Sequence, residues 1–227
     1  MEIIPVIDLM AGDVVHAQAG QRDTYQPIDS VLTKAKDLLG VVADILSFFP
    51  FKIIYIADLD AISGQNIEMV LYQHCLELFP DTTFWLDAGI RDKTDSQRVI
   101  SSDRLVPVLG SESLEALSLL QNTEPCVLSL DFKQGQFLGD EKILQQAEYW
   151  PERVIVMNLD RVGLERGPDF SLIAEIASRK RNVQIVAAGG VRGQNDLVLL
   201  KRAGVEQALI ASALHNGMVT KDMLEQY

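Results

Sequence analysis

An internal repeat is the sequence feature that most restricts how this chain can fold. The segment Ile56-Ala57-Asp58-Leu59-Asp60 matches Val156-Met157-Asn158-Leu159-Asp160 at an offset of 100 residues. The turn Ala88-Gly89 matches Gly189-Gly190 at an offset of 101 residues. Such near-constant spacing is hard to obtain by chance. It indicates two similar halves, neither of which could cover its own sheet edge alone.

The repeat extends to the other strand ends of each half. Gly110-Ser111 matches Ala211-Ser212 at the same offset of 101 residues. Ile7-Asp8-Leu9 matches Leu130-Asp131-Phe132 at an offset of 123 residues, which gives the first half a longer first loop and helix. We therefore expect four strand–helix units in each half.

Strand-like and helix-like stretches alternate along the whole chain. Most of the strand-like stretches are continuously apolar and rich in β-branched residues, as expected for strands that are covered on both faces. Strands are expected at residues 3–7, 53–56, 83–86, 106–108, 126–130, 154–157, 184–186 and 207–210. Helical patterns lie between them at residues 31–39, 67–78, 113–120, 170–177 and 197–203.

This alternation predicts one α/β domain over residues 1–227, a single (β/α)8 TIM barrel built from two similar half-barrels. A doubly wound open sheet has the same alternation and is the alternative, but the internal repeat favours the barrel. Most of the prolines fall at expected element boundaries, and no linker-like tract interrupts the chain.

Charge and composition disfavour several classes of partner and site. The net charge of −12 argues against binding to nucleic acid. No apolar run is long enough to span a membrane, and the acidic N-terminal segment reads as a strand rather than a signal peptide. Cys75 and Cys126 make no metal-ligand spacing, so we expect reduced cysteines and a cytoplasmic protein. A monomer and a small homo-oligomer both fit the sequence.

Two aspartates are the strongest catalytic candidates. Asp8 and Asp131 each follow an apolar strand directly, in corresponding positions on the first and fifth expected strands. Side chains at the C-terminal strand ends of such a barrel face one shared site, and opposite strands place two carboxylates across its mouth. One could then take up a proton while the other donates one. The alternative is that each aspartate caps a loop; the symmetric placement favours catalysis.

Small-residue turns in both halves predict two phosphate sites, and therefore a ligand with a phosphate at each end. Glycines allow backbone N–H groups to approach an anion, and the loops after the seventh and eighth strands of such barrels often bind phosphate. The carboxylate of Asp87 weakens the first-half site unless it faces away. The expected phosphate-binding residues are Gly89, Arg91, Gly110 and Ser111 in the first half, and Gly189, Gly190, Ala211 and Ser212 in the second.

Other polar residues are weaker candidates. His16, on the first loop or a short hairpin, and Asp58, after the second strand, are candidate substrate contacts. Asp60 has a counterpart in Asp160 and is expected to be structural. The three histidines are scattered along the chain, so no metal site is expected.

Six segments form an ordered set that runs from residue 3 to about residue 217: Ile4-Pro5-Val6-Ile7-Asp8-Leu9, Ala57-Asp58-Leu59-Asp60-Ala61, Ala88-Gly89-Ile90-Arg91, Ser129-Leu130-Asp131, Ala187-Ala188-Gly189-Gly190-Val191 and Ala213-Leu214-His215-Asn216-Gly217. This set resembles the histidine-biosynthesis (β/α)8 barrels. It is more similar to the phosphoribosylformimino-5-aminoimidazole carboxamide ribotide isomerase than to the imidazole glycerol phosphate synthase cyclase.

The resemblance implies an isomerase with a phosphorylated small-molecule substrate and with neither a cofactor nor a metal. In that family two strand-end aspartates, matching Asp8 and Asp131, carry an Amadori rearrangement of an aldose to a ketose on a bis-phosphorylated aminosugar. By this resemblance Asp8 is the general base and Asp131 the general acid.

The chain departs from the isomerase pattern at several substrate-contacting positions. Met157 stands where the isomerase has a threonine beside its substrate, and it is a further candidate contact. His16 replaces an arginine of the first loop, and Ala211 replaces a glycine. The short loop at residues 133–139 lacks the Gly-Trp pair that stacks on substrate. These changes indicate a divergent, isomerase-like paralogue.

Three functions therefore stay open. The first is the histidine-pathway isomerase, and the second is the same two-aspartate chemistry on another phosphorylated sugar or aminosugar. The third is a non-catalytic protein that binds a phosphorylated metabolite. Paralogues of this kind are associated with organisms that make methanopterin-type one-carbon cofactors, which makes that biosynthesis an alternative setting.

Overall fold

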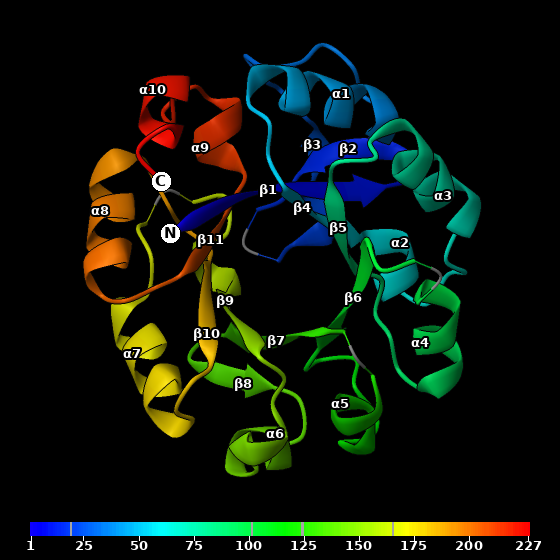
Figure 1. The fold of residues 1–227 in the computed structure, drawn as a ribbon, viewed down its shortest axis with the longest axis vertical. Helices are drawn as coiled ribbons and strands as arrows, with labels where there is room; N and C mark the ends of the chain where they lie inside the picture. Colours follow the sequence, from blue (N-terminus) through cyan, green and yellow to red (C-terminus); the bar gives the residue numbers. More distant parts are fainter. Residues whose placement is uncertain (19, 101, 124, 165) are drawn as a thin grey trace.

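Eight parallel strands close into a barrel. The structure is a computed structural model that describes residues 1–18, 20–100, 102–123, 125–164 and 166–227. The last strand pairs with the first, which closes the ring (Figure 1). This confirms the predicted barrel and rules out the open sheet. In spatial order the strands are β1 (Glu2–Met10), β4 (Ile53–Asp58), β5 (Thr83–Asp87), β6 (Leu105–Gly110), β7 (Val127–Lys133), β9 (Arg153–Asn158), β10 (Gln184–Ala188) and β11 (Gln207–Ile210).

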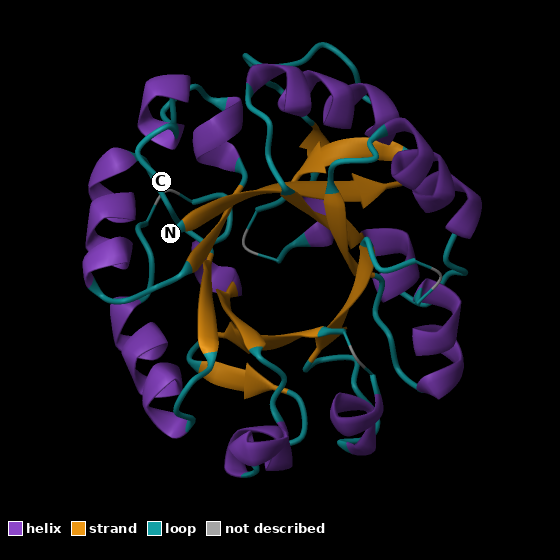
Figure 2. Ribbon diagram, in the orientation of Figure 1, coloured by secondary structure: helices purple, strands orange, loops and turns teal. Residues whose placement is uncertain are grey.

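Helices surround this ring of strands, as Figure 2 shows. Each of the longer helices buries one apolar side against the strands; α1, for example, buries Leu38, Val41, Val42 and Ile45. The helices are α1 (Leu38–Phe48), α2 (Leu59–Ile62), α3 (Met69–Leu78), α4 (Lys93–Val99), α5 (Ser118–Asn122), α6 (Lys142–Gln145), α7 (Phe170–Arg179), α8 (Gln194–Arg202), α9 (Ser212–His215) and α10 (Lys221–Leu224). Short 3-10 turns lie at Arg22–Thr24, Ala147–Tyr149 and Leu159–Arg161.

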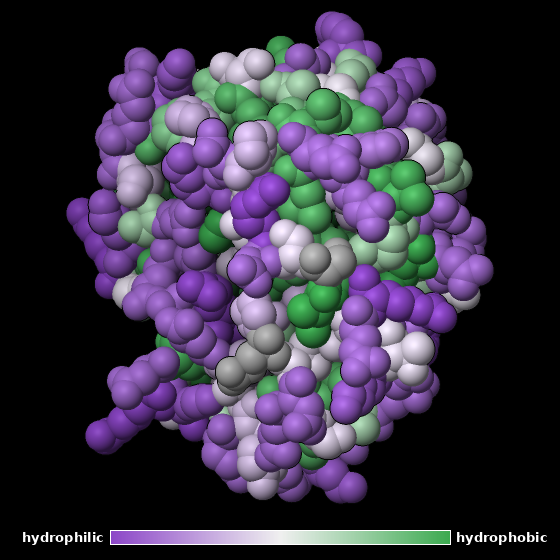
Figure 3. Space-filling view, turned by 45° about the vertical axis from the view of Figure 1, so that its right-hand side comes forward, coloured by the Kyte–Doolittle hydropathy of each residue, from purple (hydrophilic) through white to green (hydrophobic). Residues whose placement is uncertain are grey.

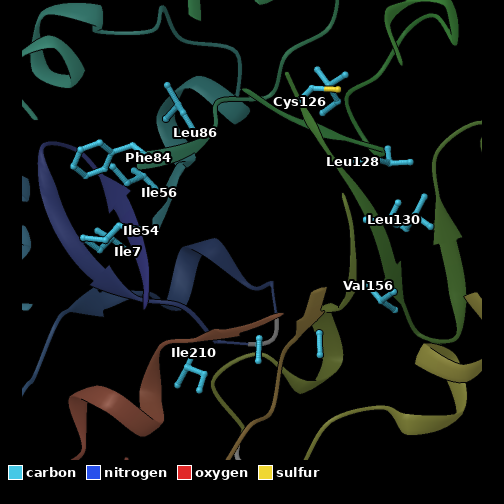
Figure 4. Packing of buried hydrophobic residues seen from close by; sticks show 14 of the residues in the cluster. Ile7, Ile54, Ile56, Phe84, Leu86, Cys126, Leu128, Leu130, Val156 and Ile210 are labelled. Atoms are coloured by element: carbon cyan, nitrogen blue, oxygen red, sulfur yellow. The ribbon is translucent and has the colours of Figure 1, made fainter. Parts of the chain in front are cut away.

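Alternate residues along each strand belong to two separate hydrophobic clusters. Ile54 and Ile56 pack in the larger cluster with the helices, whereas Tyr55 and Ala57 belong to the smaller cluster inside the barrel. Figure 4 shows members of the larger cluster on several strands. Because a strand turns successive side chains to opposite faces, the apolar strands predicted from the sequence supply both layers. The inward-facing set also carries the polar side chains of the candidate site.

A β-hairpin follows the first strand of each half. The strands β2 (Asp13–His16) and β3 (Gln26–Pro27) extend the sheet beside β1, and β8 (Gln136–Leu138) pairs with β7. Each hairpin turn has a non-glycine residue at positive φ followed by a glycine, which is the turn that two-residue hairpins favour. The residues at positive φ are Ala11, at 54°, and Gln134, at 53°.

Corresponding aspartates hold these two hairpins. The Ala11 N–H donates to Asp60 over 2.6 Å, and the Gln134 N–H donates to Asp160 over 2.5 Å. The expected structural role of the pair Asp60 and Asp160 is therefore confirmed. The repeat extends beyond the strands to the contacts that fix the loops above them.

Two expected helices begin later than their patterns predicted. The helix expected at residues 31–39 begins at Leu38, because the Asp37 side chain caps it through the Gly40 N–H at 3.0 Å. Upstream, the Lys36 carbonyl accepts from the Val14 N–H of the first hairpin, so this segment is held by the sheet. The helix expected at residues 113–120 is only α5, since the Glu115 N–H donates to the Arg91 carbonyl instead of forming a helical bond.

Hydrophilic side chains cover most of the face drawn in Figure 3, and hydrophobic residues gather towards its middle and upper part. None of the helices in the described residues is long and apolar enough to cross a membrane. Cys75 and Cys126 are both buried thiols.

Candidate active site

A cavity of about 640 Å³ lies where the C-terminal ends of the barrel strands meet the hairpins and loops. This is the end at which barrels of this kind hold their sites, because the loops after the strands converge there. Of the residues predicted from the sequence, the cavity lining includes Asp8, His16, Asp131, Met157, Gly189, Gly190, Ala211 and Ser212.

Asp8 and Asp131 reach this cavity from opposite strands. Asp8 is on β1, Asp131 is on β7, and three strands separate them in each direction around the ring. Asp131 is buried and accepts a hydrogen bond from the Ser129 hydroxyl at 2.7 Å. Its Oδ2 lies 3.3 Å from the Ser111 hydroxyl, which is shared with the nearer Leu138 carbonyl. Asp8 is partly exposed to the cavity. The two carboxyl groups therefore share one space, as their corresponding places in the repeat predicted.

Burial raises the pKa of both carboxyl groups. Desolvation, followed by the charge of Asp87, raises the pKa of Asp8 to about 7. The same two causes raise the pKa of Asp131 to about 7, against the hydrogen bond from Ser129, which favours the ionised form. At neutral pH a state with one carboxyl protonated and the other ionised is then well populated. Such a pair can donate a proton and accept one in the same cycle.

A third carboxylate, Asp87, also lines the cavity. Its strand, β5, lies midway between β1 and β7 in the ring, and its Oδ2 accepts from the Tyr55 hydroxyl at 2.9 Å. Burial and the neighbouring charge of Asp87 raise the pKa of Tyr55 well above its usual value, so the hydroxyl stays a donor. Asp87 therefore faces into the cavity, not away from it.

The second-half turn requires its two glycines. Gly189 and Gly190 have φ values of 88° and 83°, a region that other residues rarely adopt. A Cβ atom at Gly190 would lie 2.5 Å from the Gly167 carbonyl oxygen, which no side chain can tolerate. The Gly190 carbonyl in turn accepts from the Gly167 N–H at 3.0 Å. This turn brings bare backbone to the cavity lining, beside Ala211 and Ser212.

The first-half turn is built differently, and Gly89, Arg91, Gly110 and Ser111 are not part of the cavity lining. The Gly89 N–H donates to Asp87, and the Arg91 guanidinium donates to the carbonyls of Gly89 and Ile62, each at 3.1 Å. The Ser111 N–H donates to the Ser129 carbonyl at 2.8 Å. Arg91 faces a smaller cavity of about 390 Å³, which it shares with Glu112.

Asp58 also lies outside the cavity lining, where the sequence had made it a candidate contact. It is buried in the barrel wall, where it caps α2 through the Ala61 N–H at 3.0 Å and accepts from the Tyr72 hydroxyl at 2.6 Å. In the strand register Asp8 pairs with Ala57, so Asp58 comes one residue later and shares the outward face of β4 with Ile54 and Ile56. The side chain therefore points to its own helix, which is the capping role expected of aspartate at such a position.

Sequence reasoning left the direction of Asp87 open, and the cavity residues that it missed include Tyr55, Lys133 and His215. Lys133 donates to the Gly20 carbonyl at 3.2 Å and so joins β7 to the first loop. His215 is buried against the Ser30 hydroxyl at 2.9 Å, and burial followed by the charge of His16 lowers its pKa to about 4. The alternation of β4 and β7 would have revealed Tyr55 and Lys133, which share a face with Ala57 and Asp131.

The described residues include no group of three or more His, Cys, Asp or Glu side chains arranged to hold a metal ion. Asp8, Asp87 and Asp131 come from three different strands of the ring. What the geometry offers is proton transfer at two separate places on one ligand.

Comparison with known proteins places this barrel among relatives. A curated, uncharacterised protein of Methanocaldococcus jannaschii is 32% identical over 227 residues, covering 96% of this chain and 95% of the relative. Proteins named 1-(5-phosphoribosyl)-5-((5-phosphoribosylamino)methylideneamino)imidazole-4-carboxamide isomerase are similar at lower identity. The one from Methanocella arvoryzae is 25% identical, with 96% of this chain and 95% of the relative covered. The one from Photorhabdus laumondii, numbered 2, is 27% identical, with 96% and 92% covered.

A family model described as "Histidine biosynthesis protein" matches residues 2–220, which is nearly the whole length of the barrel. Because the match spans both halves and every strand that contributes to the cavity, we conclude that this chain belongs to the histidine biosynthesis protein family.

Proposed function

We propose that this chain is an isomerase-like enzyme that converts a phosphorylated aldose, an aminosugar or its close analogue, into the ketose by an Amadori-type rearrangement. The observation that carries the proposal is the pair Asp8 and Asp131, which reach one cavity from opposite strands and both have a pKa raised to about 7. The relatives named as isomerases support the same class of reaction.

The rearrangement needs two proton transfers at different atoms of the sugar. A proton is first given to the ring oxygen, so that the ring opens and the C1–nitrogen bond gains double-bond character. A proton is then removed from C2, and the resulting enaminol becomes the ketose. Two carboxyl groups on opposite sides of the sugar can perform both steps, if one is protonated and the other ionised at the start. We assign Asp8 as the base and Asp131 as the acid, following the family resemblance.

Positioning is the second requirement of this chemistry. The turns at Gly189-Gly190 and Ala211-Ser212 present backbone to the cavity, and we assign them to the phosphate of the substrate. An anchored phosphate holds the sugar between the two aspartates, which converts proton transfer into a reaction within one complex. His16 and Met157 line the same space and are assigned to contacts with the sugar or its nitrogen substituent.

A ligand screen followed by a turnover assay tests the proposal. A thermal-shift screen of phosphorylated metabolites, including the bis-phosphorylated histidine-pathway intermediate, finds ligands; one present at 100 times its dissociation constant stabilises the fold by about 2.7 kcal/mol. Each ligand is then incubated with the protein in D2O, and NMR follows ketose formation and exchange of the C2 proton. The proposal would be contradicted if ligands bind in the cavity but none of the whole screened set shows C2 exchange.

A further inference from the structure

The two halves of the barrel differ in one side chain that faces the cavity. Asp87, at the end of β5, corresponds through the 101-residue offset to Ala188, at the end of β10. Both residues line the cavity. One end of a nearly twofold-symmetric space therefore has a carboxylate where the other end has a methyl group.

The Asp87 carboxylate lies close to the catalytic pair of the proposed mechanism. A Cβ atom placed at Gly110 would lie 3.9 Å from each Asp87 carboxylate oxygen and 3.6 Å from Asp131 Oδ2, so the two carboxylates flank the bare backbone of Gly110. The charge of Asp87 also raises the pKa of both Asp8 and Asp131. Gly110 leaves the space between Asp87 and Asp131 unfilled by a side chain.

The backbone donors of the first-half turn are already used within the protein. The Gly89 N–H donates to Asp87 itself, at 3.3 Å, and the Ser111 N–H donates to the Ser129 carbonyl. The Ser111 hydroxyl donates to the Leu138 carbonyl at 2.7 Å. A phosphate at this end would meet the Asp87 carboxylate and would have to displace these bonds to find its own donors.

We propose that the cavity accepts a ligand with a single phosphate, which binds at the second-half turns, and that Asp87 binds the end of the ligand opposite to this phosphate. The ligand class is a monophosphorylated aminosugar whose far end carries an ammonium or hydroxyl donor for Asp87, with Tyr55 holding that carboxylate in place. This inference rests on the proposed function, because it names the substrate class of the same site.

Crystals soaked in inorganic phosphate test the inference without any assumption about the sugar. The expected result is one phosphate ion per chain, in contact with Gly190 and Ser212. An ion beside Gly89 and Ser111 in the unmodified protein overturns the inference, and so does the absence of an ion at both turns.

Matched sugar phosphates test the role of Asp87. We expect fructose 6-phosphate to bind about tenfold more tightly than fructose 1,6-bisphosphate by calorimetry, since a second phosphate meets the Asp87 charge. Asp87→Asn keeps an acceptor for Tyr55 but removes the charge, so the two dissociation constants should become similar. Glu77→Gln removes one charge from the exposed side of α3 and should keep the original ratio.

The same pair of ligands separates this inference from the isomerase proposal. Tighter binding of the bisphosphate, or a ratio that Asp87→Asn leaves unchanged, overturns the inference even if the protein proves to be an isomerase. If neither sugar binds, the phosphate soak decides. If the protein shows the expected preference but forms no ketose from any bound aldose, the isomerase proposal is contradicted. The role of Asp87 in selecting the ligand then still stands.

Discussion

The Ser129 hydroxyl donates to Asp131 Oδ1 over 2.7 Å. Ser129 precedes Asp131 by two residues and lies on the same inward face of β7. This bond favours the ionised form of Asp131 and opposes the effect of burial on its pKa. Removing it in Ser129→Ala should raise the pKa of Asp131. The pH profile of turnover should be bell-shaped with a maximum near 7, because one carboxyl must be protonated and the other ionised.

The limb that moves in Ser129→Ala identifies the role of Asp131. If Asp131 is the acid, the alkaline limb of the profile moves to higher pH; if it is the base, the acidic limb does. The measurement is turnover between pH 5 and 9 for both proteins. Movement of the acidic limb would reverse our assignment, and a profile unchanged at both limbs would remove Asp131 from the rate-determining proton transfer.

Replacing either aspartate should abolish most of the turnover and leave binding nearly intact. Asp8→Asn and Asp131→Asn keep the size of the side chain but cannot transfer a proton, so each should lower turnover by at least about 10²-fold. Dissociation constants should change far less, because the phosphate is anchored at the second-half turns. Calorimetry and the NMR assay measure the two effects, with Glu77→Gln as the charge-matched control. Intact turnover with lost binding in Asp131→Asn would show a binding residue instead.

Asp131→Asn should also stabilise the fold at high pH. Asp131 has a folded-state pKa of about 7, above the ordinary aspartate value of 3.8, so the folded state binds more protons than the unfolded state between about pH 4 and pH 7. Stability from this group is therefore present below pH 4 and lost as the pH rises to 7, at about 1.4 kcal/mol per pKa unit. Asp131→Asn should unfold at higher urea concentration than the unmodified protein at pH 8. The advantage should disappear near pH 4.

Two glycines with nearly the same positive φ allow a controlled test of the phosphate turn. Gly190 and Gly204 have φ values of 83° and 81°. A Cβ atom at Gly190 would contact the Gly167 carbonyl, whereas a Cβ atom at Gly204 would have no neighbour within 4 Å. Gly204→Ala should cost about 1 kcal/mol for the positive φ alone. Gly190→Ala should cost about 1–3 kcal/mol more, and it should abolish phosphate binding. Equal losses in urea unfolding would mean that the turn is not tightly packed.

The barrel could be predicted from the sequence because the signals for its strands are strong and repeated. Continuous apolar runs, covered on both faces, occur at most of the eight strand positions, and the offsets connect the two halves. Helix beginnings were harder, as at Leu38, because capping by Asp37 and the bond from Val14 to the Lys36 carbonyl decide where α1 begins. Those contacts join residues that the pattern of hydrophobicity does not connect.

The site was predictable only in part. Asp8 and Asp131 could be found because position and symmetry both marked them, whereas Asp58 comes one residue later in the strand register, faces outwards and caps α2. Alternation along the strand sets the direction of a strand-end carboxylate, so Asp58 faces outwards with Ile56. There it meets the Tyr72 hydroxyl, which lies 14 residues away in the chain. Asp87 shows the converse case, since it shares the inward face of β5 with Trp85 and meets Tyr55 of the neighbouring strand there.

The exchange of Ala188 for Asp87 between the halves also gives the cavity a polarity. A cavity made of two equal halves would let an elongated ligand bind in either of two orientations. Each of the two aspartates would then lie beside C2 of the ligand in half of the complexes. One carboxylate at one end makes the two directions unequal in energy. The ligand then has a head and a tail, and Asp8 and Asp131 can specialise, because each always meets the same atoms.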